Sequence, residues 1–180
     1  MKADLTIWTL GHSTRPIAEF LGLLAENRVR TVADIRSHPG SRHSPQYGQT
    51  AMHDELLKQG VEYQWMPALG GRRRARADST NVVWRNASFR GYADYMQTAE
   101  FAQGLAELLQ LARKAPTTLM CAEAVWWRCH RSMVADALKA RGVRVLHIMG
   151  AGSVTEHPFT APARIRNGQL TYAQGEQSPG

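Results

Sequence analysis

Five short apolar segments, rich in residues that favour β-strands, alternate along the chain with segments whose apolar residues recur at helical spacing. Strands that alternate with helices form βαβ units, in which the strands run parallel and the helices cover both faces of the sheet. We therefore expect an α/β fold with a mostly parallel five-stranded sheet. The predicted strands are residues 5–10, 29–35, 61–66, 117–121 and 143–148.

Helix boundaries are indicated by residues that cap or break helices. Thr14 is the expected cap of a first helix that ends near Asn27, and Thr98 is the expected cap of a longer helix with an apolar face. With helices flanking both faces of the sheet, the predicted architecture is Rossmann-like and three-layered. The remaining predicted helices are residues 49–59, 91–96 and 129–141.

Two segments without sustained periodicity, 36–45 and 69–90, are predicted to be long loops. Near the end of the sequence, Asn167-Gly168 separates two short β-prone stretches within residues 163–172. This dipeptide is the strongest short signal for a hairpin with a type I′ turn. We therefore expect a C-terminal β-hairpin in addition to the sheet.

The length of 180 residues predicts one domain, because domains cluster at about 100–200 residues. We divide it into a core at 1–150, a C-terminal loop and hairpin at 151–175 and a frayed tail at 176–180. No apolar run approaches the roughly 20 residues that span a bilayer, and the first residues lack the basic region and cleavage site of a signal peptide. These features predict a cytoplasmic protein without a membrane partner.

The balance of charges indicates the kind of ligand. Lys and Arg exceed Asp and Glu by 22 to 15, which gives a net charge of +7 and a pI near 9.9. Such a surface attracts anions, so we expect an anionic small molecule or a nucleic acid as ligand. The two cysteines of a chain this long are expected to be reduced thiols. No motif indicates a cofactor or an oligomeric state.

Reactive side chains follow several of the predicted strands. In open parallel sheets, ligands bind beyond the carboxyl ends of the strands. The residues at those ends are therefore the first candidates for a site, and they could converge on one crevice. They are His12 and Ser13 after the first strand, Asp34 and Arg36 at the second, Cys121 and Glu123 at the fourth, and Cys129, His130 and Arg131 at the following helix.

Each candidate also has a purely structural explanation. His12 and Ser13 can cap the first helix, since serine is common at helix starts. Asp34 and Arg36 lie on one face of a strand by the two-residue period and can form a structural ion pair. Cys121, at a buried strand end, can be a small core residue.

The segment 121–131 is harder to explain by structure alone, because it holds two thiols, a carboxylate, an imidazole and two guanidinium groups. A thiol at a helix N-terminus beside cations has its thiolate stabilised, which would lower the pKa of Cys129 and make it a nucleophile. The same backbone amides, with Arg128 or Arg131, could equally bind a phosphate without chemistry.

Two other interpretations of this segment fail on spacing. From Cys121 to Arg128 the separation is one residue longer than in the Cys-x5-Arg loop of protein tyrosine phosphatases, and no glycine lies between them. Two cysteines and one histidine without paired C-x-x-C spacing do not indicate a metal site. We therefore expect neither that phosphatase loop nor a bound metal.

A second region suits contact with nucleic acid. Residues 72–76 contain four arginines, and 84–92 interleave aromatic rings with arginines that include Arg90. Trp126 and Trp127 add two further rings. Stacking rings and cations bind single-stranded nucleic acid. A solvated basic loop and aromatic core packing are the structural alternatives.

Several motifs within residues 5–150 resemble, together and in register, the bacterial and archaeal family called domain of unknown function 488. The resemblance implies a compact α/β domain, adds Arg42 to the candidate anion contacts, supplies no reaction and does not cover the hairpin. The family often has proline where Trp126-Trp127 stand here, a departure expected to alter the pocket wall. The matching motifs are Thr9–Ser13 with Phe20 and Leu24, Val32–Ser37 with Pro39 and Arg42, Leu69–Gly71, Ser88–Met96, Met120–Glu123 and Cys129–Arg131.

Three functional hypotheses follow from these residues. The first is a small enzyme that acts on a phosphate-bearing substrate such as a nucleotide or nucleic acid, with Glu123 as general acid or base and Cys121 or Cys129 as nucleophile. The second is a nucleic-acid-binding module without catalysis, and the third is a thiol redox or sulfur-handling protein. In the first, the other contacts to substrate come from His12, Ser13, Asp34, Arg36, Arg42, Arg90, Arg128, His130 and Arg131.

Overall fold

The structure, a computed structural model, describes residues 4–40 and 42–175. Its main sheet has the strand order β3-β2-β4-β1-β5-β6. All neighbouring strands run parallel except β5 and β6, which are antiparallel. The strands are β1 (Thr6–Gly11), β2 (Thr31–Asp34), β3 (Glu62–Trp65), β4 (Thr117–Cys121), β5 (Arg144–Gly150) and β6 (Ser153–Glu156).

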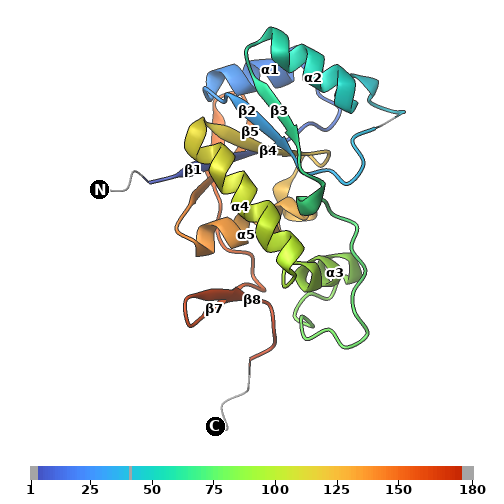
Figure 1. Cartoon of the computed structure of the whole chain (residues 1–180), viewed down its shortest axis with the longest axis vertical. Helices are drawn as coiled ribbons and strands as arrows, with labels where there is room; N and C mark the ends of the chain where they lie inside the picture. Colours follow the sequence, from blue (N-terminus) through green and yellow to red (C-terminus); the bar gives the residue numbers. More distant parts are fainter. Residues whose placement is uncertain (1–3, 41, 176–180) are drawn as a thin grey trace.

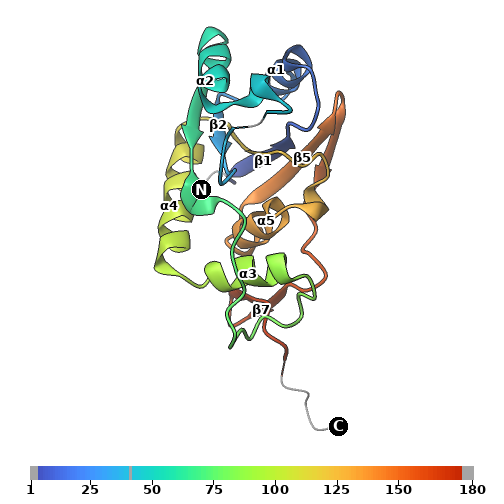
Figure 2. The same ribbon diagram turned by 90° about the vertical axis from the view of Figure 1, so that its right-hand side faces the viewer.

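Helices cover both faces of this sheet (Figures 1 and 2). One face packs against α1 (Ile17–Glu26) and α2 (Gln49–Lys58), and the other packs against α4 (Ala99–Lys114) and α5 (Arg131–Ala140). The short helix α3 (Ala87–Tyr95) joins the α4–α5 layer. The predicted three-layer α/β fold with a mostly parallel sheet is confirmed.

Two hydrophobic cores lie on opposite sides of the sheet, because successive strand side chains point to opposite faces. Leu10, Val32 and Met120 face α1 and α2. Their neighbours Ala33 and Leu119 face α4 and α5. All five are fully buried, which explains why these strands appear in the sequence as continuous apolar runs rather than alternating ones.

The sheet has one strand more than the five predicted ones. All five predicted strands are present, and β6 is added as an antiparallel edge strand. Every residue of β6 is exposed, so it shows no alternation of apolar and polar residues. The usual signal for a strand was therefore absent from this segment.

Three predicted helix starts need correction. Thr14 does not cap the first helix, which begins after Pro16 without a side-chain cap. The helix expected at 91–96 begins four residues earlier, because the side chain of Asn86 accepts hydrogen bonds from two backbone N–H groups of its first turn. The last helix begins at Arg131 rather than 129. The predicted cap Thr98 is confirmed by its bond from the N–H of Phe101.

The C-terminal hairpin forms a separate two-stranded sheet of β7 (Arg164–Arg166) and β8 (Gln169–Thr171). Asn167 and Gly168 both have positive φ, 52° and 75°, as a type I′ turn requires. In Figures 1 and 2 the hairpin lies beyond α5, next to α3. The expected hairpin is confirmed, and the tail at 176–180, expected to be frayed, lies outside the described residues.

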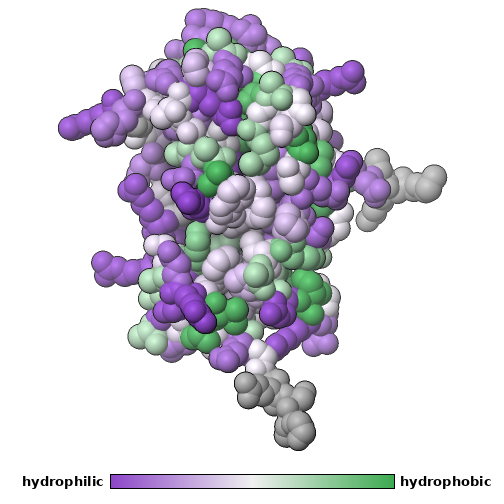
Figure 3. Space-filling view, turned by 180° about the vertical axis from the view of Figure 1, so that it is seen from behind, coloured by the Kyte–Doolittle hydropathy of each residue, from purple (hydrophilic) through white to green (hydrophobic). Residues whose placement is uncertain are grey.

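The surface mixes polar and apolar side chains. On the face shown in Figure 3, apolar residues form small separate patches among charged and polar ones. Among the helices of residues 4–40 and 42–175, none is long and apolar enough to cross a membrane.

Strand order explains which loops meet. Because β2, β4 and β1 are neighbours and parallel, their carboxyl ends lie side by side at one edge of the sheet. The β1–β4 pairing continues beyond the strands, with the N–H of His12 bonded to the carbonyl of Cys121 and that of Ser13 to Ala122. A Cβ atom on Gly11 would lie 1.7 Å from the carbonyl oxygen of Glu123. Only glycine allows this backbone approach.

We expect Gly11→Ala to lower the free energy of unfolding by about 1–3 kcal/mol or more, because the added methyl group must displace the backbone at Glu123. The matched control is Gly22→Ala in α1, where nothing lies within 4 Å of the added Cβ. That change should stabilise the protein by about 0.5–1 kcal/mol, as alanine does inside helices. Urea unfolding of both variants measures the difference, and equal midpoints would contradict the expectation.

Candidate functional site

A pocket of about 240 Å³ lies at the carboxyl edge of β2 and β4. It brings together five of the residues selected from the sequence, and its whole lining comes from three separate parts of the chain. Cations, thiols, a carboxylate and imidazoles all border it. Its lining consists of Arg36, Ser37, His38, Gly71, Arg72, Cys121, Ala122, Glu123, Cys129 and His130.

The two thiols are in direct contact in the wall of this pocket. The two Sγ atoms are 2.9 Å apart, with the Cys129 thiol donating to the sulfur of Cys121, and both cysteines are free. The Cys121 thiol in turn points at the carbonyl oxygen of Glu123, at 3.7 Å. The backbone N–H of Arg131, in the first turn of α5, also points at the Cys129 sulfur, at 3.4 Å. The hydrogen bond with Cys121 lowers the pKa of Cys129, whereas burial raises that of Cys121. Cys129 is therefore the more acidic thiol of the pair.

His130 stands beside Cys129 with a defined proton position. Its Nε2 lies 2.9 Å from the carbonyl oxygen of Ile35, which only accepts, so Nε2 carries the proton. Its Nδ1 then has a free lone pair and lies 3.4 Å from the Cys129 sulfur. Burial lowers the pKa of His130 and keeps the ring neutral. The ring packs on Gly71, where a Cβ would lie 2.9 Å from Nδ1.

Arg36, another lining residue, is held rigidly by its neighbours. Its Nε and Nη2 donate to the two carboxylate oxygens of Asp34 at 2.9 and 2.7 Å, and the hydroxyl of Tyr63 donates to the same carboxylate. Burial alone would lower the pKa of Arg36, but the bonds to Asp34 outweigh burial and raise it. The structural ion pair foreseen for these two residues therefore exists, and it also fixes a cation at the pocket.

His12 and Ser13 do not cap α1. His12 stacks on Tyr47 with ring centroids 4.2 Å apart, and its Nδ1 donates to the carbonyl of Ser13. Its Nε2 is thus an acceptor and faces Nη1 of Arg36 at 3.3 Å. Burial lowers the pKa of His12. Ser13 adopts the left-handed conformation, with φ 47°. His12 therefore positions Arg36 rather than bordering the pocket.

Arg131 is an unusual buried cation. Its side chain is 1% exposed, and its Nη2 donates to the carbonyl of Ala124. Within the described part of the chain, its Nε and Nη1 have no hydrogen-bond partner. The positive charge lowers the pKa of the nearby Cys129 thiol. A thiolate at Cys129 therefore compensates a guanidinium whose burial is otherwise costly.

Three predicted anion contacts do not reach the pocket. Arg42 is exposed in the loop before η1 (Pro45–Tyr47), a 3-10 helix, and Arg128 is exposed in η3 (Trp126–Arg128). Arg90 lies on α3, where it donates to the carbonyl of Trp84. None of the three is among the residues that line the described pocket. They were selected for different reasons, Arg42 by the family resemblance, Arg90 by the aromatic and arginine pattern, and Arg128 by its place between the two cysteines, and none of these patterns determines where a side chain points.

Several lining residues appeared in the sequence motifs but were not selected as site residues. Ser37 donates to the carbonyl of Gly71 at 2.6 Å and ties the two long loops together. Arg72 is exposed and has a left-handed backbone, with φ 59°. The sequence features that pointed to these residues were the lengths of the two predicted loops and the Gly70-Gly71 pair. Across residues 4–40 and 42–175, no three His, Cys, Asp or Glu side chains gather closely enough to hold a metal ion.

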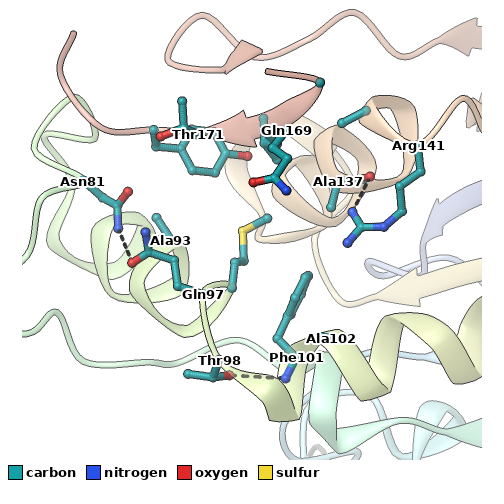
Figure 4. Close-up of a pocket in the computed structure, with 15 residues that line it drawn as sticks. Asn81, Ala93, Gln97, Thr98, Phe101, Ala102, Ala137, Arg141, Gln169 and Thr171 are labelled. Carbon is teal, nitrogen blue, oxygen red and sulfur yellow. Dashed lines mark hydrogen bonds between the residues drawn. The ribbon is translucent and has the colours of Figure 1, made fainter. Parts of the chain in front are cut away.

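A larger cavity of about 630 Å³ lies elsewhere, between α4, α5 and β8 (Figure 4). Amide side chains such as Gln97 and Gln169 border it together with Arg141 and apolar residues that include Phe101. Among the described residues that line it, none carries a thiol, imidazole or carboxylate. The reactive groups therefore gather in the smaller pocket, which is the candidate site.

A buried network of hydrogen bonds joins the C-terminal part of the chain to α5. Asp136, which is fully buried, accepts hydrogen bonds from Nε2 of His157, from the backbone and hydroxyl of Thr160, and from the hydroxyl of Tyr172. Three residues of the C-terminal segment thus converge on one carboxylate in the helix that follows Cys129. The network fixes that segment to α5.

The same network continues to the sheet. His157 Nδ1 lies 2.8 Å from Nε2 of His147 on β5, and Nδ1 of His147 contacts the hydroxyl of Thr9 on β1. Trp126 stacks on His147 with the rings nearly parallel and their centroids 4.6 Å apart. Neither Trp126 nor Trp127 is among the residues that line the described pocket, so the expected alteration of its wall stays a prediction.

Fold and site together define an α/β protein with a thiol–imidazole pair at the carboxyl ends of parallel strands. Residues 16–138 match the family described as "Domain of unknown function DUF488", and the chain belongs to this family. The match extends from the start of α1 into α5 and includes the whole lining of the pocket. Searches of curated proteins and of solved structures gave no match.

The buried network predicts a pH dependence of stability. Burial lowers the pKa of His147 to about 2, whereas an unfolded histidine titrates near about 6.5. Between pH 6.5 and the lower pKa of the folded state, only the unfolded state takes up the proton. The contribution of His147 to the free energy of unfolding is therefore complete above pH 6.5. It decreases as the pH is lowered, by up to about 1.4 kcal/mol per pH unit.

Urea unfolding between pH 7 and 5 measures how the free energy of unfolding changes with pH. The substitution His147→Gln should reduce this slope by about the contribution of one bound proton. Circular dichroism at pH 7 verifies that the variant is folded. An unchanged slope in the folded variant would show that His147 takes up its proton equally in both states.

Proposed function

We propose that the protein is a small cysteine-dependent enzyme that acts on a phosphate-bearing substrate, with Cys129 as nucleophile. The observation that carries this proposal is the position of the Cys129 sulfur, 2.9 Å from the Cys121 sulfur and 3.4 Å from Nδ1 of His130, in the wall of a pocket that also holds cations. A nucleophile within reach of a base that is itself oriented by a third group is the usual signature of covalent catalysis. Here the third group is the carbonyl of Ile35.

Activation of the thiol follows from the proton positions. His130 carries its proton on Nε2, so its Nδ1 accepts the Cys129 proton. The resulting thiolate can only accept hydrogen bonds, so the Cys121 thiol, 2.9 Å away, then donates to it, together with the N–H of Arg131. These donors, together with the first turn of α5, stabilise the negative charge on sulfur.

The reaction consists of two displacements. The Cys129 thiolate attacks phosphorus, the bond from phosphorus to the ester oxygen breaks, and the Glu123 carboxyl gives its proton to the leaving oxygen. Water then attacks the thiophosphate, Glu123 takes a proton from it, and the thiolate is released together with phosphate. Glu123 is exposed and borders the pocket, as a group that serves both leaving group and water must.

Binding of the phosphate is assigned to the cations of the pocket. The guanidinium group of Arg36 is held in place by Asp34 and His12, so its N–H donors are already oriented before a ligand binds. Arg72 is exposed at the mouth and can close over the ligand. Guanidinium groups suit the planar faces of phosphate and carboxylate.

The contacts of the basic loop favour this proposal over the nucleic-acid-binding module. Arg73 lies over the ring of Tyr95 at 3.6 Å, and Arg76 pairs with Asp78. The aromatic residues interleaved with the arginines pack inward, since Tyr92 is 1% exposed. Fewer cations and rings are therefore available for a nucleic acid than the sequence suggested.

We expect Cys129→Ser to reduce hydrolysis of p-nitrophenyl phosphate, or of the best ester in a panel of phosphomonoesters and phosphodiesters, by at least about 10³-fold. Glu123→Gln should reduce it by about 10²–10⁴-fold, the range for general acid–base groups. Glu107→Gln, an exposed carboxylate on α4, is the matched control and should retain full activity. The proposal fails if no ester is hydrolysed or if Cys129→Ser remains active.

A second measurement tests binding without turnover. The rate of Cys129 alkylation by iodoacetamide should reach half its maximum at a pH below about 8.5, the pKa of an ordinary thiol, because the pKa of Cys129 is lowered by its donors.

Inorganic phosphate should slow the alkylation of Cys129 by occupying the pocket. Arg72→Ala should weaken this protection about tenfold, whereas Arg85→Ala, an exposed arginine outside the lining, should not. Alkylation that phosphate does not affect would contradict phosphate binding at this pocket.

A further inference from the structure

The proposed reaction forms no bond to one reactive group in the wall of the pocket, the Cys121 thiol. Its sulfur lies 2.9 Å from the Cys129 sulfur, within hydrogen-bond contact. A disulfide bond is about 2.05 Å long, so the two sulfurs, now 2.9 Å apart, need to approach by only about 0.9 Å. Both cysteines are reduced, and both border the pocket.

We propose that the pair is a site of reversible oxidation by hydroperoxides, in which Cys121 resolves an oxidised Cys129 to an intramolecular disulfide. The inference rests on the reactive Cys129 of the proposed function. It adds a second co-substrate class, a hydroperoxide, and a second state of the site in which the nucleophile is blocked.

The chemistry balances with the hydroperoxide as oxidant. The Cys129 thiolate attacks the terminal peroxide oxygen, the O–O bond breaks, and the departing alkoxide or hydroxide takes up a proton, leaving a sulfenic acid on Cys129. The Cys121 thiol then attacks that sulfur and displaces hydroxide, which leaves as water with the Cys121 proton. One disulfide forms while the peroxide is reduced by two electrons.

The surroundings assign the two roles. Cys129 is the more accessible of the two, 7% exposed against 1% for Cys121, and it has the N–H of Arg131 and the imidazole of His130 as neighbours. A small peroxide in the pocket therefore meets Cys129 first. Attack on a hydroperoxide needs a thiolate, and the donors around Cys129 favour that form.

The fold permits the short movement required. Cys121 is the last residue of β4, where the backbone pairing with His12 holds it in place. Cys129 lies in the connection before α5, outside a regular element. The connection can therefore carry its sulfur toward Cys121 without disturbing the sheet.

The experiment uses the full chain, reduced and then treated with a small excess of hydrogen peroxide. We expect the intact mass to fall by two hydrogen atoms and the number of alkylatable thiols to fall from two to none, with reversal by dithiothreitol. Peptide mapping should find Cys121 joined to Cys129 within one chain. A chain that gains oxygen atoms without this link, or forms only links between chains, overturns the inference.

Variants distinguish the roles of the two thiols. Cys121→Ser should accumulate a sulfenic acid on Cys129 that dimedone traps, whereas Cys129→Ser should leave Cys121 unmodified. If Cys121 is oxidised as fast as Cys129, the assigned roles are wrong. A Cys129 that is alkylated and protected by phosphate as described above, but forms no disulfide, overturns this inference alone, whereas a Cys129 inert to both reagents overturns it together with the proposed function.

Discussion

The candidate site depends on one backbone contact, between the end of β1 and the chain that leaves β4. Gly11 lies against the carbonyl of Glu123, and hydrogen bonds from His12 and Ser13 extend the strand pairing into the loop. The contact fixes the path of the chain just after Cys121 and so decides where the carboxylate of Glu123 can stand. It also places His12 behind Arg36. A side chain at position 11 would separate the groups that the pocket brings together.

Most polar groups around the pocket are already engaged with one another, and this leaves few free for a ligand. Asp34 accepts from Arg36 and Tyr63, and His130 donates to a carbonyl. Such preorganisation lowers the cost of ordering the site when a ligand binds. The carboxylate of Glu123 and the guanidinium of Arg72 are exposed at the pocket, and the Cys129 sulfur is a lining nucleophile whose neighbours favour its ionised form.

The sequence predicted the fold class and the five parallel strands, because buried parallel strands such as β2 and β4 have continuous apolar runs and the edge strand β3 alternates. It also located the thiols and Glu123, since ligands bind where parallel strands end. It could not supply the strand order, which decides that β2, β4 and β1 are neighbours. Nor could it separate Arg36, which lines the pocket, from Arg90 and Arg128, which do not, because the direction of a side chain depends on the path of the folded backbone. The exposed edge strand β6 lacked any alternation to detect.

The family match ends at residue 138, just after Asp136, whereas His157, Thr160 and Tyr172, which donate to this carboxylate, lie beyond it. A buried carboxylate without donors is costly, while replacing both sides of such a contact by apolar groups is nearly neutral. The acid and its donors are therefore expected to be inherited as a unit. In a chain without these three donors, an apolar residue at position 136 would avoid the cost of a buried carboxylate, so the residue at this position is tied to a segment that lies outside the family match.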